Sequence, residues 1–449
     1  MRKIKQFLFL SLLLSGMVYS SCKKSDTTTE TTTTTVAGVG EYIGTVSVHS
    51  KSDTMLTYFL SKNYNRITGS LELYTSDDID FAKYLAKLKS VTGSVRLYKI
   101  RNNDLSFLSN VTKITGDLQI SACPNLTSLS GLYKLDTLSN NLIVENNPKI
   151  KDLLGLGQVK TMVNLVVTNN AALQSLVGLS NLTSLTGNIS IGENPVLESV
   201  NGLGNLVTVG SNVLMYNNPQ QLNLYGLNSL KEITGNLTLS GLQSLTDITA
   251  LSSVDDTISS IVITGCNHLT DLGGLNKLPK IRKDLRLVNC NELINLQGLT
   301  KIDTIGGTIE LSKLSAFRSF AGPTALKGIR KDLRVVECNA LTSLDGLTKL
   351  DSINGSLVLD DNSSLKNLKG IDILKVIRGN VQILNNENLL TLDGLDFISK
   401  ISGNLDVYYN PKLTSYCAIK SVTLTGFAYI GFNGYSPTLT QIRSGSCSK

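Results

Sequence analysis

Hydrophobic residues recur along this chain at an almost constant interval. The residue that opens each short apolar alternation, here called the strand anchor, is followed by the next anchor after 24 residues in twelve of fourteen intervals and after 23 in two. The motif ITGSLEL at 67–73 returns as ITGNLTL at 233–239 and as ISGNLDV at 401–407. A fixed period of this length is typical of a solenoid, in which each repeat forms one coil. The anchors are Leu71, Val95, Leu118, Leu142, Leu165, Ile189, Val213, Leu237, Ile261, Leu285, Ile309, Leu333, Leu357, Val381 and Leu405.

One repeat, residues 341–365, shows how a coil is built. The alternation at Leu357, Val358 and Leu359 predicts a strand with one face in the core. The leucines before it stand three residues apart, which predicts a tight, 3₁₀-like return path. A single coil cannot bury its own leucines, so we expect coils to stack about 4.8 Å apart with their strands in one parallel sheet. The period therefore predicts an all-β-rich solenoid of about 15 coils over residues 67–412.

The fifth residue after the anchor shows a second regularity. It is Asn or Cys in eleven coils, and a buried amide there can bond backbone groups that the turn leaves unpaired. A thiol fits the same position as a small apolar group. Leu242 and Leu314 interrupt this series, so we expect those two turns to differ locally. The predicted ladder residues are Cys123, Asn147, Asn170, Asn194, Asn218, Cys266, Cys290, Cys338, Asn362, Asn386 and Asn410.

The LxxL and LxxN spacings resemble those of leucine-rich repeats. The glycine step of IxGxLxI more closely resembles the receptor L domain, and residues 41–449 as a whole resemble repeat lipoproteins that Bacteroidetes display on their surface. The resemblance implies a right-handed, parallel β-helix-like stack with a cap at each end. It does not imply a ligand, because one fold serves many functions.

The N-terminal residues fit an exported lipoprotein. Arg2, Lys3 and Lys5 precede a short apolar segment, so residues 1–21 are predicted to be a signal peptide. Ser20-Ser21-Cys22 resembles a lipobox with Cys22 as the lipidated residue, although an ordinary secretory signal would leave Cys22 without a role. Residues 22–40 are rich in threonine and are expected to be a flexible tether. These features predict a lipid-anchored protein at the outer membrane, exposed on the cell surface.

Both ends of an open solenoid need caps. We expect residues 41–66 to form a strand and a short helix, N-capped by Ser52 or Asp53. Residues 413–449 resemble the C-terminal cap of the bacterial repeat proteins. Cys417 and Cys447 are the only cysteines outside the ladder and the lipobox, so we expect them to pair; two free thiols are the alternative.

Catalytic chemistry gains little support. The chain has no glycine-rich phosphate loop, GxSxG turn or HExxH helix. Asp284, Arg286, Asp332 and Arg334 match charged residues that line polysaccharide-cleaving β-helices, but they recur in register as KDLR, as a duplicated repeat would. We therefore expect no enzyme and no cofactor, with a polysaccharide-cleaving enzyme and a passive spacer as alternatives.

One segment contains residue types that can bind a metal ion. Cys266 and His268 with Cys290 in the next coil suggest ligands, but both thiols are expected in the core and the imidazole at an exposed corner, so no metal site is predicted. A disulfide between Cys266 and Cys290 is an alternative that parallel side-chain directions disfavour.

The outward strand position predicts a binding surface. It carries the apolar residues Ile143, Val166, Leu214 and Val262, and farther along it carries Arg286, Glu310 and Arg334 with alternating charge. Exposed apolar residues on a sheet favour a contact surface, although strand propensity or a covering loop would also explain them. We expect a monomeric binding or adhesion module for an extracellular protein or glycan, with protein preferred because aromatic platforms are scarce. The formal net charge of +7 gives no support for nucleic-acid binding.

Two further sets occupy fixed repeat positions. Arg282, Lys283, Arg330, Lys331 and Arg378 stand two coils apart and would meet an anionic glycan or a lipid headgroup, or else are solvated turn residues. The resemblance also implies O-glycosylation where Asp is followed by Ser or Thr and then by an apolar residue or Thr. The alternative is that Asp and Ser or Thr recur there because they suit turns and the repeat was duplicated. The candidate acceptors are Thr27, Thr54, Thr137, Thr257, Thr304 and Ser352.

Overall fold

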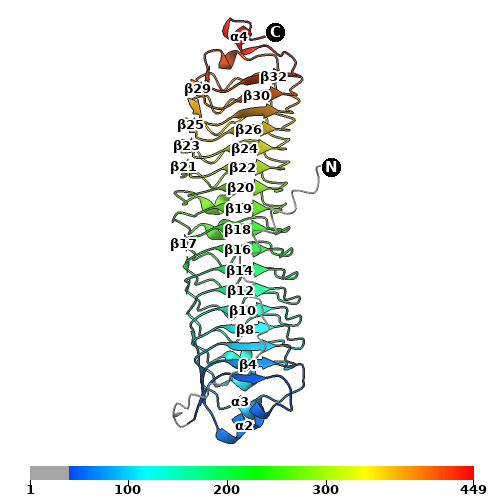
Figure 1. The fold of residues 1–449 in the computed structure, drawn as a ribbon, viewed down its shortest axis with the longest axis vertical. Coiled ribbons are helices and arrows are strands. Elements are labelled where there is room, and N and C mark those ends of the chain that lie inside the picture. The colour runs from blue at the N-terminus through cyan, green and yellow to red at the C-terminus, as the bar shows by residue number, and fades with distance from the viewer. Residues whose placement is uncertain (1–39) are drawn as a thin grey trace. The chain divides into compact units, whose positions relative to one another are not determined.

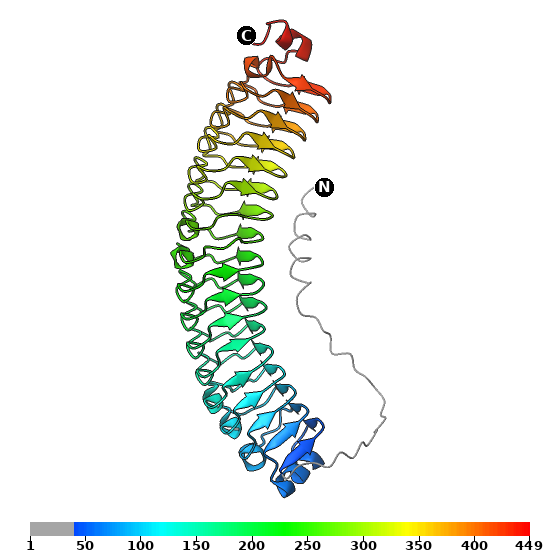
Figure 2. The same ribbon diagram turned by 90° about the vertical axis from the view of Figure 1, so that its left-hand side faces the viewer.

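The computed structural model describes residues 40–449. They form a parallel β-solenoid of about 16 turns with about 24 residues per turn and little helix, as the period predicted. Figures 1 and 2 show the coils stacked one on the next, with one four-residue strand of each coil in the same position. Outside the described residues lie the predicted signal peptide, almost all of the predicted tether, and the candidate residues Cys22 and Thr27.

One continuous parallel sheet runs through the whole stack. Each anchor pairs with the anchor of the next coil, for example Leu142 with Leu165 and Leu165 with Ile189. Its strands, in spatial order, are β2 (Val46–Val48), β4 (Leu71–Tyr74), β6 (Val95–Tyr98), β8 (Leu118–Ser121), β10 (Leu142–Glu145), β12 (Leu165–Thr168), β14 (Ile189–Gly192), β16 (Val213–Tyr216), β18 (Leu237–Ser240), β19 (Ile261–Thr264), β20 (Leu285–Val288), β22 (Ile309–Ser312), β24 (Leu333–Val336), β26 (Leu357–Asp360), β28 (Val381–Leu384), β30 (Leu405–Tyr408) and β32 (Ala428–Gly431).

Short strands form a second series just before the glycine step of most coils, and two coils have only isolated bridges there, at Ile258 and Ile281. The first sheet contains β1 (Glu41–Ile43), β3 (Arg66–Thr68), β5 (Ser90–Val91), β7 (Lys113–Ile114) and β9 (Thr137–Leu138). The second contains β11 (Thr161–Met162), β13 (Ser184–Leu185), β15 (Thr208–Val209) and β17 (Glu232–Ile233). The third contains β21 (Thr304–Ile305), β23 (Gly328–Ile329), β25 (Ser352–Ile353), β27 (Val376–Ile377), β29 (Lys400–Ile401) and β31 (Thr423–Leu424).

The rest of each coil is a tight return path. Single 3₁₀ turns occur at η1 (Ser106–Leu108), η2 (Ser130–Leu132), η3 (Thr249–Leu251), η4 (Gly273–Leu275) and η5 (Cys417–Ile419). Glycine is required where neighbouring return paths touch: a Cβ on Gly155, which has φ +121°, would lie 1.9 Å from the carbonyl oxygen of Leu129. Leucines three residues apart, such as Leu341, Leu344 and Leu347, are fully buried and fill the interior.

The N-terminal cap has the expected elements. Helix α2 (Thr54–Lys62) begins after Asp53, whose side chain accepts a hydrogen bond from the Met55 amide. Asp53, not Ser52, is therefore the N-cap. Leu56 and Phe59 are buried, and the short helix α3 (Ala82–Leu85) follows in the next coil. Strand β2 pairs with β4, so the sheet begins before residue 67.

The C-terminal segment contains one more coil before the cap. Strands β31 and β32 continue both ladders past Leu413, where the leucine period stops. The small residue Ala428 occupies the anchor position there, so the hydrophobic pattern does not show the coil. Cys417 and Cys447 are joined with an S–S distance of 2.00 Å, and α4 (Leu439–Arg443) closes the chain. No helix within residues 40–449 is both long and apolar enough to cross a membrane.

Candidate functional site

Buried side-chain amides link successive coils at the turn after each four-residue strand. Asn194 is fully buried. Its side-chain Oδ1 accepts a hydrogen bond from the backbone N–H of Asn170 at 3.0 Å, and its Nδ2 donates one to the Val167 carbonyl at 3.0 Å. The backbone N–H of Asn194 in turn donates to Asn218 Oδ1 at 3.0 Å. We call this series the turn ladder, and its role is structural because its polar atoms are used inside the stack.

The turn ladder tolerates leucine without a change of backbone. The residue before each ladder position has a positive φ, and this holds before the interruptions too, with φ 65° at Gly241 and 57° at Lys313. The backbone before Leu242 and Leu314 thus keeps the same sign of φ, and the expected local difference lies in the hydrogen bonds, because the buried leucine side chains cannot accept them. Buried Gln221 compensates beside the first interruption, since its Oε1 accepts from Asn218 Nδ2 at 3.3 Å.

The four cysteines of the turn ladder are buried and free. Burial raises the pKa of Cys123 and of Cys290 to about 11, and that of Cys338 to about 12. Burial likewise raises the pKa of the Cys266 thiol. These thiols remain protonated at neutral pH and act as small apolar groups.

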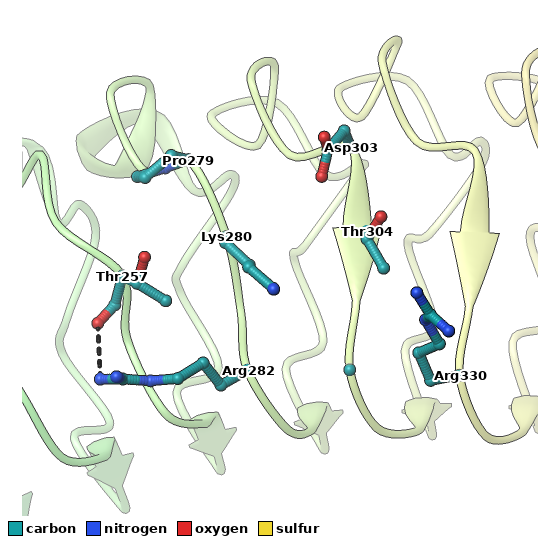
Figure 3. A pocket seen from close by; sticks show the side chains of 8 residues that line it. Thr257, Pro279, Lys280, Arg282, Asp303, Thr304 and Arg330 are labelled. Atoms are coloured by element: carbon teal, nitrogen blue, oxygen red, sulfur yellow. Dashed lines mark hydrogen bonds between the residues drawn. The ribbon is translucent and has the colours of Figure 1, made fainter.

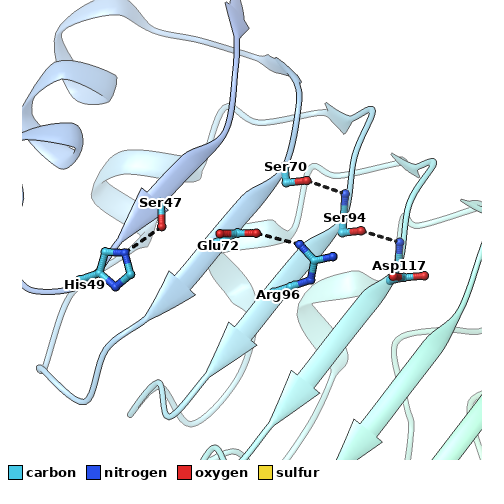
Figure 4. Close-up of polar contacts among 7 residues, drawn as sticks. All are labelled: Ser47, His49, Ser70, Glu72, Ser94, Arg96 and Asp117. Atoms are coloured by element: carbon cyan, nitrogen blue, oxygen red, sulfur yellow. Dashed lines mark hydrogen bonds and ion pairs between the residues drawn. The ribbon is translucent and has the colours of Figure 1, made fainter. Parts of the chain in front are cut away.

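Sequence reasoning missed a second ladder at the residue directly before each anchor. In Figure 4, Ser70 Oγ accepts from the Ser94 amide and Ser94 Oγ accepts from the Asp117 amide, each at 3.1 Å. Asp284 and Asp332 belong to this pre-strand ladder, because each accepts from the backbone amide of the next coil. Only Ser, Thr, Asn and Asp occur directly before the fifteen anchors. All four side chains can accept a hydrogen bond, and this shared property is the sequence signal from which the ladder could have been predicted.

The turn ladder also has a member that the sequence period did not reveal. Asn433 Oδ1 accepts from the Asn410 amide at 2.9 Å, and its Nδ2 donates to the Val407 carbonyl at 2.8 Å. It lies five residues after Ala428, so the same spacing identifies it once the last coil is recognised.

The surface formed by the second and fourth residues of the four-residue strands is here called the strand face. Ile143, Val166, Leu214 and Val262 all lie on it, and each keeps part of its side chain exposed. The pairing register brings Ile143 beside Val166, whereas Ser190 and Thr238 stand between the later apolar residues. The predicted apolar surface is thus present as an interrupted row.

Charged residues follow along the strand face. Arg286 Nε lies 2.8 Å from Glu310 Oε2, and Arg96 pairs with Glu72 at 2.7 Å near the N-terminal end (Figure 4). Arg334 stands next to Glu310 in the register but makes no ion pair with a described residue. The predicted charge ladder is therefore one ion pair followed by an arginine that is not ion-paired.

Aromatic side chains gather at the C-terminal end of the strand face and at the turns that border it. Tyr408 and Tyr429 are strand-face residues, whereas Phe427 directly precedes β32, and Tyr409 and Phe432 directly follow β30 and β32. The rings of Tyr409 and Phe432 are stacked, with centroids 5.0 Å apart and planes 10° apart. Tyr408 contacts both rings, and Phe427 contacts Tyr429. Phe432 and Phe427 are 71% and 70% exposed. Aromatic residues are few in this chain, but coil stacking collects several of them at this end. These five residues are here called the aromatic cluster.

A groove follows the short-strand side of coils 257–378. It consists of two adjoining open cavities of about 590 and 310 Å³, which share Thr304 and Arg330. Figure 3 shows that the side chains of the first cavity come from successive coils. We call it the basic groove; its charged lining residues are Lys280, Arg282, Asp303, Lys327, Arg330, Asp351 and Arg378.

The three arginines of the basic groove differ in their partners. Arg282 donates through Nη2 to the Thr234 and Thr257 carbonyls, at 2.9 and 3.1 Å. Arg378 Nε donates to Asn354 Oδ1 at 3.0 Å. Arg330 is exposed, and its side chain makes no hydrogen bond or ion pair with any residue of the described chain. Lys283 and Lys331 are exposed but do not line the groove.

Three candidate O-glycosylation residues line the same groove. They are Thr257, Thr304 and Ser352, and each is partly exposed. Thr137 occupies the same repeat position in β9, and Thr54 is exposed at the start of α2. Modification of these hydroxyls stays a prediction.

The three side chains weighed as metal ligands have different surroundings. His268 Nδ1 lies 2.9 Å from Glu292 Oε1 at the surface, whereas Cys266 and Cys290 are fully buried. Residues 40–449 contain no group of three or more histidine, cysteine or acidic side chains that could hold a metal ion.

Comparison with known proteins supports the repeat architecture. The receptor L domain family model matches residues 63–175. Solved structures that match include a leucine-rich repeat protein from Bacteroides ovatus, with 14% identity, a TM-score of 0.28, and coverage of 80% of this chain and 79% of that one. A TLR13 complex with single-stranded RNA matches at 16% identity and a TM-score of 0.26, over 83% of this chain and 64% of that chain, less than two thirds of its length. No curated protein matches. The family match thus supports receptor L-domain repeats within residues 63–175.

Proposed function

We propose that this chain is a non-catalytic module that binds an extracellular protein or glycan through its strand face. The observation that carries the proposal is the aromatic cluster, because five aromatic side chains gather on and beside one end of the strand face and four of them are exposed. Such surfaces mark interaction sites more often than scattered apolar residues do. Receptor L domains are typically binding scaffolds, which supports the same function class.

The strand face offers two kinds of contact to a partner. Phe432, Tyr409 and Tyr429 supply flat rings that lose little conformational freedom on binding. Farther from this end, Glu310 and Arg334 supply charges of both signs, which favour one orientation of the partner. A partner that extends along the stack, across the strands, can use both.

Array binding tests this function. Purified full-length protein carrying Cys22→Ser, so that no lipid is attached, is applied to an array of extracellular proteins and glycans. We expect specific binding that is weakened at least tenfold by Tyr409→Ala with Phe432→Ala, because truncated aromatic anchors cost more than 1 kcal/mol. Tyr133→Ala is the matched control, since Tyr133 is 54% exposed like Tyr409 but lies in a return path. Equal loss in both variants would contradict recognition by the strand face.

We also propose that the protein is anchored by lipid on Cys22 at the outer membrane and exposed on the cell surface. The support is the lipobox-like Ser20-Ser21-Cys22 and the basic and apolar segments before it. Cys22→Ser is expected to move the protein to the soluble fraction and to abolish palmitate labelling. Retention of the variant in the membrane fraction would contradict the lipid anchor. If protease added to intact cells failed to digest the parent protein, surface exposure would be contradicted.

A further inference from the structure

We propose that the basic groove is a second binding site, separate from the strand face, for a linear polysaccharide that carries sulfate or carboxylate groups. The groove has five cationic lining residues and two acidic ones. The excess of positive charge selects an anion, and the open ends of the two adjoining cavities admit a chain.

The spacing of the arginines favours a polymer over a single small anion. Arg282, Arg330 and Arg378 occupy the same repeat position in every second coil, so they stand about 10 Å apart along the stack. That interval is close to the length of one disaccharide. Asp303 and Asp351 lie in the intervening coils, so positive and negative side chains alternate along the groove. A polysaccharide with one acidic sugar in each disaccharide would present its charges at the arginines and its neutral sugars between them.

Arg330 is the central contact in this arrangement. It lines both cavities, and its guanidinium makes no ion pair or hydrogen bond with a described residue. Its guanidinium has five donors in a planar fork, which suits a sulfate or carboxylate group. Arg282 and Arg378 retain further donors beyond those already used by Thr234, Thr257 and Asn354.

The remaining lining residues fit sugar hydroxyls. Thr257, Thr304, Ser352 and Asn354 supply small donors and acceptors along the groove. No aromatic residue lines either cavity. Nucleic-acid single strands are usually held by stacking of bases on aromatic rings, so this lining favours a polysaccharide over RNA or DNA.

The N-terminal half of the same side provides an internal control. Lys113, Lys160 and Lys231 are exposed in or directly before β7, β11 and β17, the equivalent short strands. They occur singly, and the positions equivalent to Arg330 hold Thr115, Val163 and Thr234 there. Removal of these lysines changes the net charge as much as removal of the three arginines but leaves the groove intact.

Binding of defined oligosaccharides tests the proposal. Full-length protein with Cys22→Ser, made without glycosylation, is titrated with heparin oligosaccharides of increasing length, with polygalacturonate oligosaccharides and with neutral dextran. We expect binding of the two acidic series only, weakening as salt is added. Affinity should rise with length until the ligand spans about 19 Å, the distance of four coils from Arg282 to Arg378.

Substitutions then locate the site. Arg330→Gln should weaken binding about threefold to fivefold, and Arg330→Lys less, by the size of an exposed charge pair. The triple variant with Arg282, Arg330 and Arg378 changed to Gln should lose about thirtyfold to hundredfold if the contacts add. The control with Lys113, Lys160 and Lys231 changed to Gln should stay within about twofold of the parent protein. Arg330→Gln removes no hydrogen bond of the folded chain, so its result stands even if the triple variant is unstable.

Several results would overturn the proposal. Equal weakening in the lysine control would show an effect of net charge alone. If single-stranded RNA, or vesicles rich in phosphatidylglycerol, bound more tightly than the acidic oligosaccharides and depended on the same arginines, the groove would be assigned to that other polyanion. If no acidic oligosaccharide bound at low salt, the groove would not be a polysaccharide site. The strand-face variant Tyr409→Ala with Phe432→Ala should bind these oligosaccharides normally, so failure of either site is distinguishable from failure of the other.

Discussion

The two ends of the solenoid are closed in different ways. At the N-terminal end, Phe59 and Leu56 of α2 are 2% and 4% exposed, and Val46 and Val48 beneath them are buried. At the C-terminal end, Leu424, Ala428 and Ile430 of the last coil are only partly buried, and Phe427 and Phe432 beside them are largely exposed. One end hides its apolar core, and the other leaves apolar surface next to the strand face.

The difference follows from the local sequence. Helix α2 has nine residues, an aspartate N-cap and an apolar stripe that packs on the first coil. Helix α4 has five residues, too few to be stable alone, and its tail is held by the Cys417–Cys447 disulfide and by Tyr416, which donates to the Tyr435 carbonyl at 2.8 Å. A covalent link can thus fix an end without covering it, which leaves aromatic residues available for a partner.

The largest effect is expected from opening the N-terminal end. Phe59→Ala should destabilise the first coils by about 3–5 kcal/mol, because it removes a buried aromatic ring from the cap. Hydrogen exchange of the β2 and β4 amides measures this loss. Tyr58→Ala, in the same helix but 47% exposed, is the control and should have little effect. Similar losses in both variants would mean that α2 does not seal the core.

Removal of the disulfide should open the other end. Replacing Cys417 and Cys447 by Ser frees a loop with a sequence separation of 30 and should cost about 3 kcal/mol. The expected signs are faster proteolysis after residue 431 and unchanged hydrogen exchange in β2 and β4. Loss of protection at both ends together would show that the stack unfolds as one unit.

The turn ladder should depend on position. Asn194→Ala, in the middle of the stack, should cost about 1–3 kcal/mol because it leaves buried backbone groups unpaired. Asn433→Ala should cost less, because Asn433 is partly exposed and water can replace its bonds. Urea unfolding followed by hydrogen exchange compares the two. Equal costs would mean that the last coil excludes water as well as the middle does.

The smallest change in stability is expected for the exposed aromatic residues. Phe427→Ala and Phe432→Ala should each alter the free energy of unfolding by less than about 0.5 kcal/mol, because both side chains are already in water. Thermal unfolding measures this. A strong destabilisation would show that the aromatic cluster is part of the cap and would weaken its proposed role in binding.

The sequence predicted the repeated part of the molecule well because two periods coincide there. Alternation within Leu357–Leu359 and the 24-residue interval between anchors place each strand and its buried face independently. The last coil was missed because Ala428 replaces a large anchor, so the hydrophobic signal weakens although the backbone pairing persists.

Side-chain partners were harder to predict than side-chain positions. The interval of 48 residues placed Arg282, Arg330 and Arg378 in register. It could not show that, of these three side chains, only that of Arg330 makes no hydrogen bond with a described residue. Tyr408 and Phe432 stand 24 residues apart, so their contact was available from the period. The number of aromatic residues does not indicate this contact, whereas their repeat position does.

The positive φ before every turn-ladder position has a consequence for how such a chain changes over generations. Fourteen residues other than glycine adopt this conformation in the described chain, and most of them repeat it at the same place in successive coils. Any two coils therefore present equivalent joining points. A gene exchange that removes or duplicates one whole repeat rejoins compatible backbones, whereas a shift of a few codons places large side chains where two return paths touch. The number of coils can thus vary freely while the cross-section of the molecule stays constant.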